Sequence, residues 1–446
     1  MPTYARKLGL FSATMAVIGG IIGSGIFLNP AVVAGRVGSA SLTLTAWILG
    51  GAVALLGAFI FGELAARNPR VGGGYAYLRD AFGRLPAFLY AWALLLMVAT
   101  GAIAAVAFTF ASYAGALFGL APDALPWVAG GAILLLSLLN YFGVQPAAWT
   151  QNLLTVLKLA ALAILIVAGL LLTPQFTLEP SSVASTTPPV AAAGTLAVTL
   201  ALASAFVPVL FAYGGWQQTN FIAEELVDPE RNLPKALVVG VIGVVAVYLL
   251  ANVAYLRVLG VGGLAASGAP AADTMSAVLG PNGRTLISVG ILISTFGFLD
   301  LVIMVSPRVY QAMAADGLFF RAFAGLSPKF RTPAVAIAAQ GVWACGLLAT
   351  RTYGQLLDYV TFADWIFFGA TAATLFVYRR GDGPGSRPGF RVPGYPWTVF
   401  LFLAAAGYVV LGSIQSNPGN ALRGAALLAL GVPVFLYWSR RTASRP

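Results

Sequence analysis

Long apolar segments alternate with short polar breaks along the whole chain. We predict twelve helices from this pattern, at residues 8–34, 40–66, 86–118, 124–145, 149–172, 194–223, 233–259, 284–313, 333–350, 355–378, 396–416 and 420–438. A helix needs about 20 apolar residues to cross the hydrocarbon core of a bilayer. The pattern therefore predicts an all-α integral membrane protein with twelve transmembrane helices, in which residues 1–446 form a single polytopic membrane domain. The stretch 173–193, rich in Pro, Ser and Thr, is predicted to be a loop.

Composition supports a membrane environment. Hydrophobic residues make up 59% of the chain and charged residues 9%, and the mean hydropathy is +0.87. Soluble domains have about 45–50% apolar and about 25% charged residues. A soluble fold of this length could not bury so much apolar surface, so the lipid bilayer is an expected partner.

The basic residues predict the orientation in the membrane. With the N-terminus in the cytoplasm, 19 of the 25 basic residues lie in cytoplasmic segments: Arg6, Lys7, Arg67, Arg70, Arg79, Arg84, Arg231, Lys235, Arg308, Arg321, Lys329, Arg331, Arg379, Arg380, Arg387, Arg391, Arg440, Arg441 and Arg445. Only Arg36, Arg284, Arg351 and Arg423 lie outside. This bias follows the positive-inside rule and places both termini in the cytoplasm. It also accounts for the net charge of +11 without nucleic acid as a partner.

The residues available for catalysis are few. The chain has no histidine and a single cysteine, Cys345, inside an apolar stretch. Metal sites, cofactors and Cys-His or Ser-His nucleophiles are therefore not expected, and neither is an enzyme. A channel is disfavoured because no filter loop is apparent. A membrane sensor would need a signalling domain or a long tail, and about seven residues flank the outermost segments.

Two predicted helices carry clusters that weaken a helix. The first contains four glycines within Gly19–Gly25, and the sixth contains Gly214 and Gly215. Each glycine costs about 1 kcal/mol relative to alanine inside a helix. Matched breaks in two halves of a chain point to an inverted-repeat transporter with its site at the breaks. Here the halves are 8–172 and 194–378, and 396–438 adds helices 11 and 12.

The breaks also suggest what is bound. Unwinding a helix in a bilayer frees N–H and C=O groups that lipid cannot pair. The N–H groups of Ser24–Ile26, at the start of a half-helix, suit a carboxylate. The carbonyls of Phe211, Ala212 and Gly214 suit an ammonium group. Amino acids carry both groups on one carbon. The competing interpretation is that the glycines only allow close helix packing.

Several motifs in order resemble the amino acid–polyamine–organocation superfamily, above all its L-type amino acid transporter branch and the bacterial relatives of that branch. They are Gly23–Phe27, Gly62–Leu64, Gly72–Leu78, Asn140–Val144, Gln151–Asn152, Phe211–Trp216, Glu224–Glu225, Asp228–Pro234, Pro307–Tyr310, Ala314–Gly317, Tyr378–Arg380 and Tyr395–Pro396. The resemblance covers nearly the whole chain. It implies a LeuT-like fold of two inverted five-helix repeats, a site between helices 1, 3, 6 and 8, and alternating access.

The resemblance also implies roles for individual residues. Ile21, Ser24 and Gly25 would meet the substrate carboxylate, and Phe211 would be an aromatic gate. The complete set expected to bind substrate is Ile21, Gly23, Ser24, Gly25, Ile26, Phe211, Ala212, Tyr213, Gly214, Trp216 and Gln217. Some relatives carry an acidic residue where Gly214 stands, so its absence here favours neutral substrates. L-type relatives often have Asn where Gln217 stands.

Lys158 lies deep in the fifth segment. A charge there is costly unless it is paired, which marks the residue as functional. In sodium-coupled relatives of the same fold a cation stands at this position, so Lys158 is expected to replace it and bridge helices 1, 5 and 8. The alternative is a lysine that snorkels to the interface.

Two aspartates fall inside apolar segments. Asp300 stands where L-type relatives often carry Asn, and it is expected to pair with Lys158, sense the substrate amine or carry a proton. A protonated or water-bonded Asp300 away from the site is the alternative. For Asp364 the sequence does not choose between a cap near the outer end and a buried polar anchor.

Charged residues also gather at the cytoplasmic ends of helices, namely Glu63, Arg67, Glu225, Asp228, Glu230, Arg231 and Arg308. They are interpreted as solvated faces that signal topology, or else as a gate of ion pairs.

Sodium-independent exchange of neutral L-amino acids across a bacterial cytoplasmic membrane is the function that these features favour, with proton-coupled symport as the alternative. Some members of the L-type branch bond to a glycoprotein through a cysteine after helix 3. The matching loop here, 119–126, has no cysteine. No disulfide-linked heavy chain is therefore expected.

Overall fold

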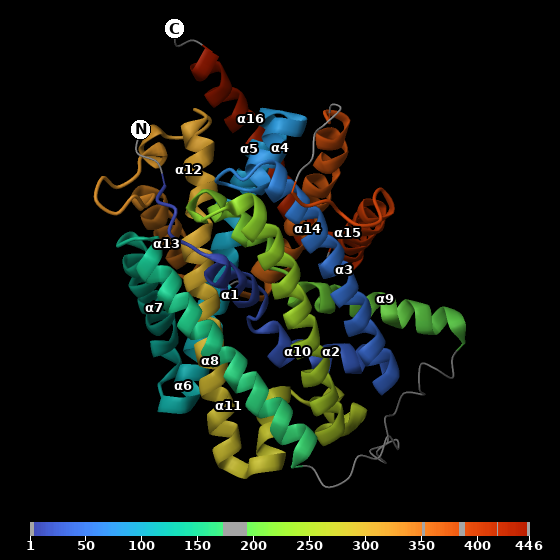
Figure 1. Ribbon diagram of the computed structural model, residues 1–446. Coiled ribbons are helices and arrows are strands. Elements are labelled where there is room, and N and C mark those ends of the chain that lie inside the picture. Colours follow the sequence, from blue (N-terminus) through green and yellow to red (C-terminus); the bar gives the residue numbers. More distant parts are fainter. Residues whose placement is uncertain (1–3, 173–193, 350–352, 383–388, 417, 444–446) are drawn as a thin grey trace.

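The computed structural model describes residues 4–172, 194–349, 353–382, 389–416 and 418–443. In this part of the chain helices are the only extended regular structure, and one isolated bridge pairs Leu8 with Leu226. The helices are α1 Leu10–Ile21, α2 Gly25–Val37, α3 Ala40–Arg67, α4 Gly74–Phe82, α5 Arg84–Ala93, η1 Leu94–Val98, α6 Ala99–Phe118, η2 Pro122–Ala124, α7 Leu125–Tyr141, α8 Val144–Leu171, α9 Thr195–Ala212, η4 Trp216–Glu225, α10 Pro229–Ala266, α11 Pro270–Val305, α12 Pro307–Ala315, η5 Arg321–Ala324, α13 Ala334–Ala349, α14 Tyr353–Arg380, α15 Trp397–Ser416 and α16 Pro418–Ala443 (Figure 1).

The apolar segments predicted from the sequence overlap these helices, although α4 lies in the predicted break 67–85. The largest difference in a helix boundary is at α11. This helix starts at Pro270 rather than near residue 284, because a polar first part precedes a kink at Gly280, whose φ is 65°. The predicted loop 173–193 and the predicted sidedness of Arg351, Arg387 and Arg445 lie outside the described residues.

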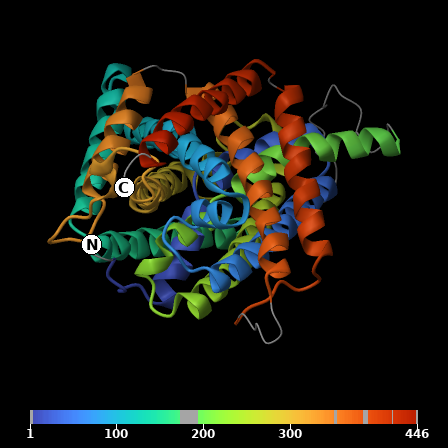
Figure 2. The ribbon, with the colours of Figure 1, turned by 90° about the horizontal axis from the view of Figure 1, so that it is seen from above.

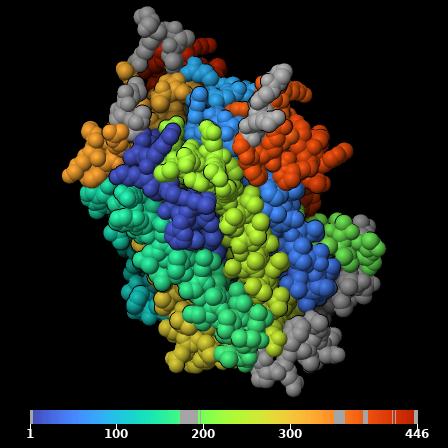
Figure 3. All heavy atoms as spheres, in the orientation of Figure 1, coloured from blue at the N-terminus to red at the C-terminus, as the bar shows by residue number. Residues whose placement is uncertain are grey.

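The helices have the length and composition of membrane spans. Among the described residues, nine are long and apolar enough to cross a bilayer, or ten if the bent pair α1–α2 is one span. Helices α8, α10 and α3 lie side by side across one face (Figure 3), and they expose large apolar residues such as Leu153, Val239 and Ile48. This outer face suits contact with lipid tails. The chain is therefore an integral membrane protein.

The remaining helices complete a bundle around the middle of the molecule. In the end-on view, α14 and α15 run next to each other, and α16 lies at an angle to them (Figure 2). The start of the chain and the end of α16 lie at the same end of the molecule in Figure 1. The two helix breaks lie in the interior of the bundle, where Ile22 and Ala212 are buried.

Two chain segments leave the α-helical path inside the bundle. Residues Ile22–Ser24 separate α1 from α2, and the two helices are bent by 41°. Helix α9 ends at Ala212, and the turn 213–215 leads into the 3-10 helix η4. The two segments, about 190 residues apart in the chain, meet each other.

The contact between the breaks is backbone against backbone. A Cβ atom added to Gly215 would lie 2.0 Å from the carbonyl oxygen of Gly20, and Gly215 has a φ of 106°. A Cβ added to Gly20 would lie 2.9 Å from the oxygen of Gly215. Gly25 approaches Ala212 in the same way, with 2.9 Å from its added Cβ to Cα of Ala212. The glycines therefore serve both the break and the close approach.

Tyr248 of α10 ties the breaks together. Its buried hydroxyl lies 3.1 Å from the carbonyl oxygen of Ile21 and 3.2 Å from that of Ala212. The ring packs edge-to-face on Trp47 of α3. One side chain thus faces a carbonyl from each break.

Gly215→Ala is expected to destabilise the fold. The added methyl group would clash with Gly20, and the alanine would have to adopt a positive φ that is strained for it. The free energy of unfolding should therefore fall by at least about 2 kcal/mol. The measurement is the fraction of purified protein that stays monodisperse after heating in detergent. Gly243→Ala, where the new Cβ would meet nothing within 4 Å, is the control and should behave like the wild type. Equal stability of both variants would contradict the close contact.

Tyr248→Phe is expected to lower stability by about 1–3 kcal/mol, because the one hydroxyl proton shared by a carbonyl of each break is lost while those carbonyls stay buried. Tyr255→Phe is the matched control on the same helix, since within the described residues nothing pairs with the buried hydroxyl of Tyr255. In thermal unfolding, Tyr248→Phe should have a lower midpoint temperature than Tyr255→Phe. A Tyr248→Phe protein as stable as Tyr255→Phe would show that the hydroxyl does not hold the breaks.

Candidate functional site

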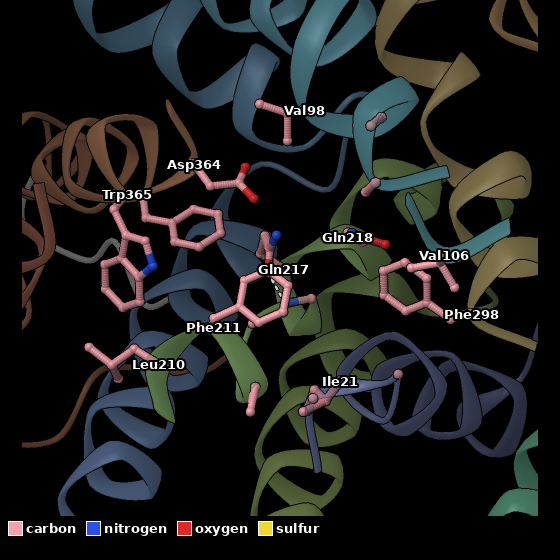
Figure 4. Close-up of a pocket in the computed structure, with 18 of the residues that line it drawn as sticks. Ile21, Val98, Val106, Leu210, Phe211, Gln217, Gln218, Phe298, Asp364 and Trp365 are labelled. Carbon is pink, nitrogen blue, oxygen red and sulfur yellow. Dashed lines mark hydrogen bonds between the residues drawn. The ribbon is translucent and has the colours of Figure 1, made fainter. Parts of the chain in front are cut away.

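A cavity of about 90 Å³ lies where the two breaks meet. The cavity has room for roughly six to nine waters. Figure 4 shows its walls, which come from the α1–α2 break, α5 to α6, the α9–η4 break, α11 and α14. The cavity is therefore built by helices from distant parts of the chain.

Eight of the residues predicted to bind substrate line this cavity. They are Ile21, Gly23, Ser24, Gly25, Phe211, Ala212, Gly214 and Gln217. Figure 4 shows the ring of Phe211 and the amide of Gln217 beside each other at its centre. The glycine-rich breaks were thus a good guide to the position of the cavity.

Three predicted residues do not line it. Tyr213 packs on Trp47 and Tyr248, Trp216 packs on Phe61, and Ile26 is fully buried. The structure therefore does not bring these three side chains to the cavity in which the other predicted residues meet. The reason is the tight turn, in which consecutive side chains point to different sides, whereas the sequence only places them in the break.

The start of α2 supplies free donors. Within the described residues, nothing pairs with the N–H groups of Ser24, Gly25 or Ile26, and Ser24 makes no side-chain cap. Ser24 and Gly25 line the cavity. A helix N-terminus with free N–H groups attracts anions, so this wall suits a carboxylate.

The carbonyls of the same break point elsewhere and are paired. The buried ammonium of Lys158 donates to the carbonyl of Ile22 at 2.8 Å and to that of Gly19 at 3.2 Å. The hydroxyl of Ser294 on α11 lies 3.3 Å from the carbonyls of Ile22 and Gly23. Lys158 therefore sits behind the break, outside the cavity lining, and joins α8 to the α1–α2 break.

Asp300 also lies behind the cavity wall. Its Oδ1 accepts a hydrogen bond of 2.9 Å from the amide of Asn140. Its other oxygen is buried and has no partner among the described residues, and no ion pair within 4.0 Å joins it to Lys158. The structure thus gives Asp300 a buried amide partner rather than an ion pair.

Sequence reasoning missed the wall contributed by α14, where Asp364 lines the cavity. Tyr90 of α5 belongs to the third predicted helix, 86–118, which was expected to border the site, but neither Tyr90 nor Gln218 was named as a site residue. Nothing in the sequence near Asp364 tells which side of its helix faces inward. A polar residue in an apolar segment was the only available signal.

Ion pairs close the end of the molecule that carries the start of the chain. Arg308 of α12 lies 2.7 Å from Glu225, and both side chains are 1% exposed. The N–H groups of Lys7 and Leu8 bond to the carbonyl of Glu225 at 2.9 and 3.0 Å. The interpretation of this cluster as solvated is therefore wrong for Arg308 and Glu225.

A second network joins α3 to α14 at the same end. Buried Glu63 pairs with Arg67 at 2.7 Å and with Arg379, and Arg67 also reaches Asp382 at 2.6 Å. The solvated interpretation is wrong for Glu63 and Arg67 as well. It is correct for Asp228, Glu230 and Arg231, which are exposed.

Helix α4 joins this end to the loop after α12. Burial and the neighbouring Asp316 carboxylate raise the pKa of Tyr75 well above its ordinary value. The hydroxyl therefore stays protonated and donates to Asp316 at 2.8 Å. Arg79 pairs with the same carboxylate at 2.8 Å.

Comparison with known proteins shows the family. A family model described as amino acid permease matches residues 8–432. The chain is 32% identical over 450 residues to the human large neutral amino acids transporter small subunit 2, covering 98% of this chain and 81% of the relative. It is 31% identical over 445 residues to the serine/threonine exchanger SteT of Bacillus subtilis, covering 98% of each protein.

A third relative is the human b(0,+)-type amino acid transporter 1, 32% identical over 417 residues, which cover 93% of this chain and 83% of the relative. These relatives are transporters and not enzymes. With a family match over nearly its full length, an all-helical membrane fold and a cavity between two broken helices, the chain belongs to the amino acid permease family of the amino acid–polyamine–organocation superfamily.

Proposed function

We propose that this protein exchanges neutral L-amino acids across the bacterial cytoplasmic membrane without sodium, by alternating access. One observation carries the proposal: free N–H donors of the α1–α2 break and the backbone of the α9–η4 break face one cavity. The carboxylate of the substrate would bind at Ser24–Ile26, and the ammonium group of the substrate would bind the carbonyls at Phe211–Gly214. The names of the relatives, which include a serine/threonine exchanger, support amino acids as substrates.

The proposed architecture is twelve transmembrane helices. Helices 1 to 10 form two inverted repeats, 8–172 and 194–378, and both termini face the cytoplasm. The two breaks would then be equivalent positions of the two repeats. Ion pairs such as Glu225–Arg308 would form part of a cytoplasmic gate that opens when the repeats move.

Sodium independence rests on Lys158. Its ammonium already donates to the carbonyls of Gly19 and Ile22 in the first break. A sodium ion bound there would need those oxygens and would meet a like charge. The lysine thus supplies the positive charge that a coupling ion would otherwise bring.

Proton symport is the second candidate, and Asp300 is the reason to keep it. A buried carboxyl oxygen without a partner is costly unless the group takes up a proton or a water. Asp300 would be the proton carrier in that mechanism. Exchange is preferred because Asp300 lies behind the cavity wall and not in it.

The first test uses the chain purified alone and placed in liposomes. Uptake of a labelled neutral amino acid is expected only when the liposomes contain a neutral amino acid, and replacing sodium with choline should not change it. Activity of the single chain would also support a protein that needs no heavy chain. Uptake into empty liposomes driven by an imposed proton gradient would reject exchange in favour of symport, and a requirement for sodium would reject both.

Lys158→Met tests the role of the lysine. The carbonyls of Gly19 and Ile22 lose their donor, and each buried group left unpaired costs about 1–3 kcal/mol. Exchange should therefore fall at least about tenfold. Lys235→Met, at an exposed position near the start of α10, is the control and should exchange like the wild type. A folded Lys158→Met protein with normal exchange would leave the lysine without a role in transport.

A further inference from the structure

Asp364 stands out among the residues around the cavity. It lies on α14, and its carboxylate points into the space bounded by Val98, Phe211 and Gln217 (Figure 4). Among the described residues that line the cavity it is the only charged one. No hydrogen bond or ion pair joins it to another described residue. The cavity therefore contains an acceptor that the protein itself does not satisfy.

The surroundings make such an acceptor expensive. Trp365 and Phe368 follow Asp364 on the same helix and line the same wall, and their rings pack edge-to-face with centroids 5.4 Å apart. A carboxylate beside apolar rings loses hydration and gains from any donor that enters. The amide oxygen of Gln217 accepts the N–H of Gly215 at 3.1 Å, and no hydrogen bond joins the NH2 group of Gln217 to Asp364. A donor carried by the ligand can therefore pair with the carboxylate.

The position of Asp364 separates it from the anchoring backbone. In Figure 4, Ile21 of the first break lies at one side of the cavity and Asp364 at the opposite side, with Phe211 and Gln217 between them. An amino acid held by its carboxylate at Ser24 and Gly25 would extend its side chain across this space. The end of that side chain would then lie next to Asp364.

We propose that Asp364 determines side-chain specificity by accepting a hydrogen bond from the hydroxyl group of a small amino acid. The proposal rests on the proposed function, since it places the substrate in the same cavity. The cavity of about 90 Å³ has room for a ligand of amino acid size. A hydroxyl group is the smallest side-chain donor and keeps the substrate neutral.

Threonine and valine give a matched test, because they have nearly the same shape and differ in the hydroxyl group. Competition by each against labelled exchange is measured for wild type, Asp364→Leu and Asp364→Asn. Wild type should prefer threonine. In Asp364→Leu the inhibition constant of threonine should rise roughly tenfold to a hundredfold, as for a lost hydrogen bond to a charged group, while that of valine stays the same or falls.

Asp364→Asn retains an acceptor oxygen without the charge, so its threonine constant should lie between wild type and Asp364→Leu. This variant also covers the case in which Asp364→Leu does not fold. Asp123→Leu, at an exposed position in η2, is the control and should keep the wild-type preference.

Other outcomes would overturn the proposal. An equal loss of threonine and valine would show that Asp364 binds the α-ammonium group or a transported proton. An effect confined to lysine and arginine would assign it to cationic side chains instead. An unchanged threonine-to-valine ratio in a variant that still exchanges would remove Asp364 from specificity but leave exchange intact, whereas absence of exchange in the wild type would reject the proposed function itself.

Discussion

The pairing of backbone groups at two breaks inside an apolar bundle is the constraint on which the rest of the structure depends. Lipid offers no partners for freed N–H and C=O groups. The structure treats the two kinds of group differently. Carbonyls of the first break accept bonds from Lys158, Tyr248 and Ser294 on three surrounding helices. The N–H groups at the start of α2 are left free beside the cavity. The protein thereby fixes the acceptor side of the break and leaves the donor side for a ligand.

The glycines serve two purposes that the sequence presents as alternatives. Gly20 and Gly215 bring the breaks into backbone contact, which is the close-packing interpretation. Gly23 and Gly25 also line the cavity, which is the binding interpretation. The close approach is what brings both breaks to one cavity, because side chains at Gly20 or Gly215 would push them apart. Close packing of the breaks and the lining of the cavity therefore follow from one arrangement.

The sequence predicts the helices well, because a membrane span needs a long apolar segment and little else. It also locates the breaks, since clustered glycines weaken a helix wherever they occur. It does not predict the direction of a side chain within a tight turn, and so Tyr213 and Trp216 were placed in the cavity although they pack against other helices. Nor does it predict partners far apart in the chain. The pair Glu225–Arg308 spans 83 residues, and local composition suggests only that both are polar. Asp364 shows the same limit, because an apolar segment without a clear periodicity does not reveal its inward face.

In the proposed function, anchoring and selection of the substrate use different groups. The lysine behind the first break binds backbone carbonyls, and the free donors of α2 are backbone groups as well. Neither depends on the side chain of a ligand, so this part of the site suits any α-amino acid. The carboxylate of Asp364 comes from a different helix and faces the other side of the cavity. A substitution there changes the chemistry offered to a ligand side chain without moving the backbone that holds the common part. Because α14 contributes side chains but no broken backbone to this wall, it can differ between related proteins while the anchoring geometry stays the same.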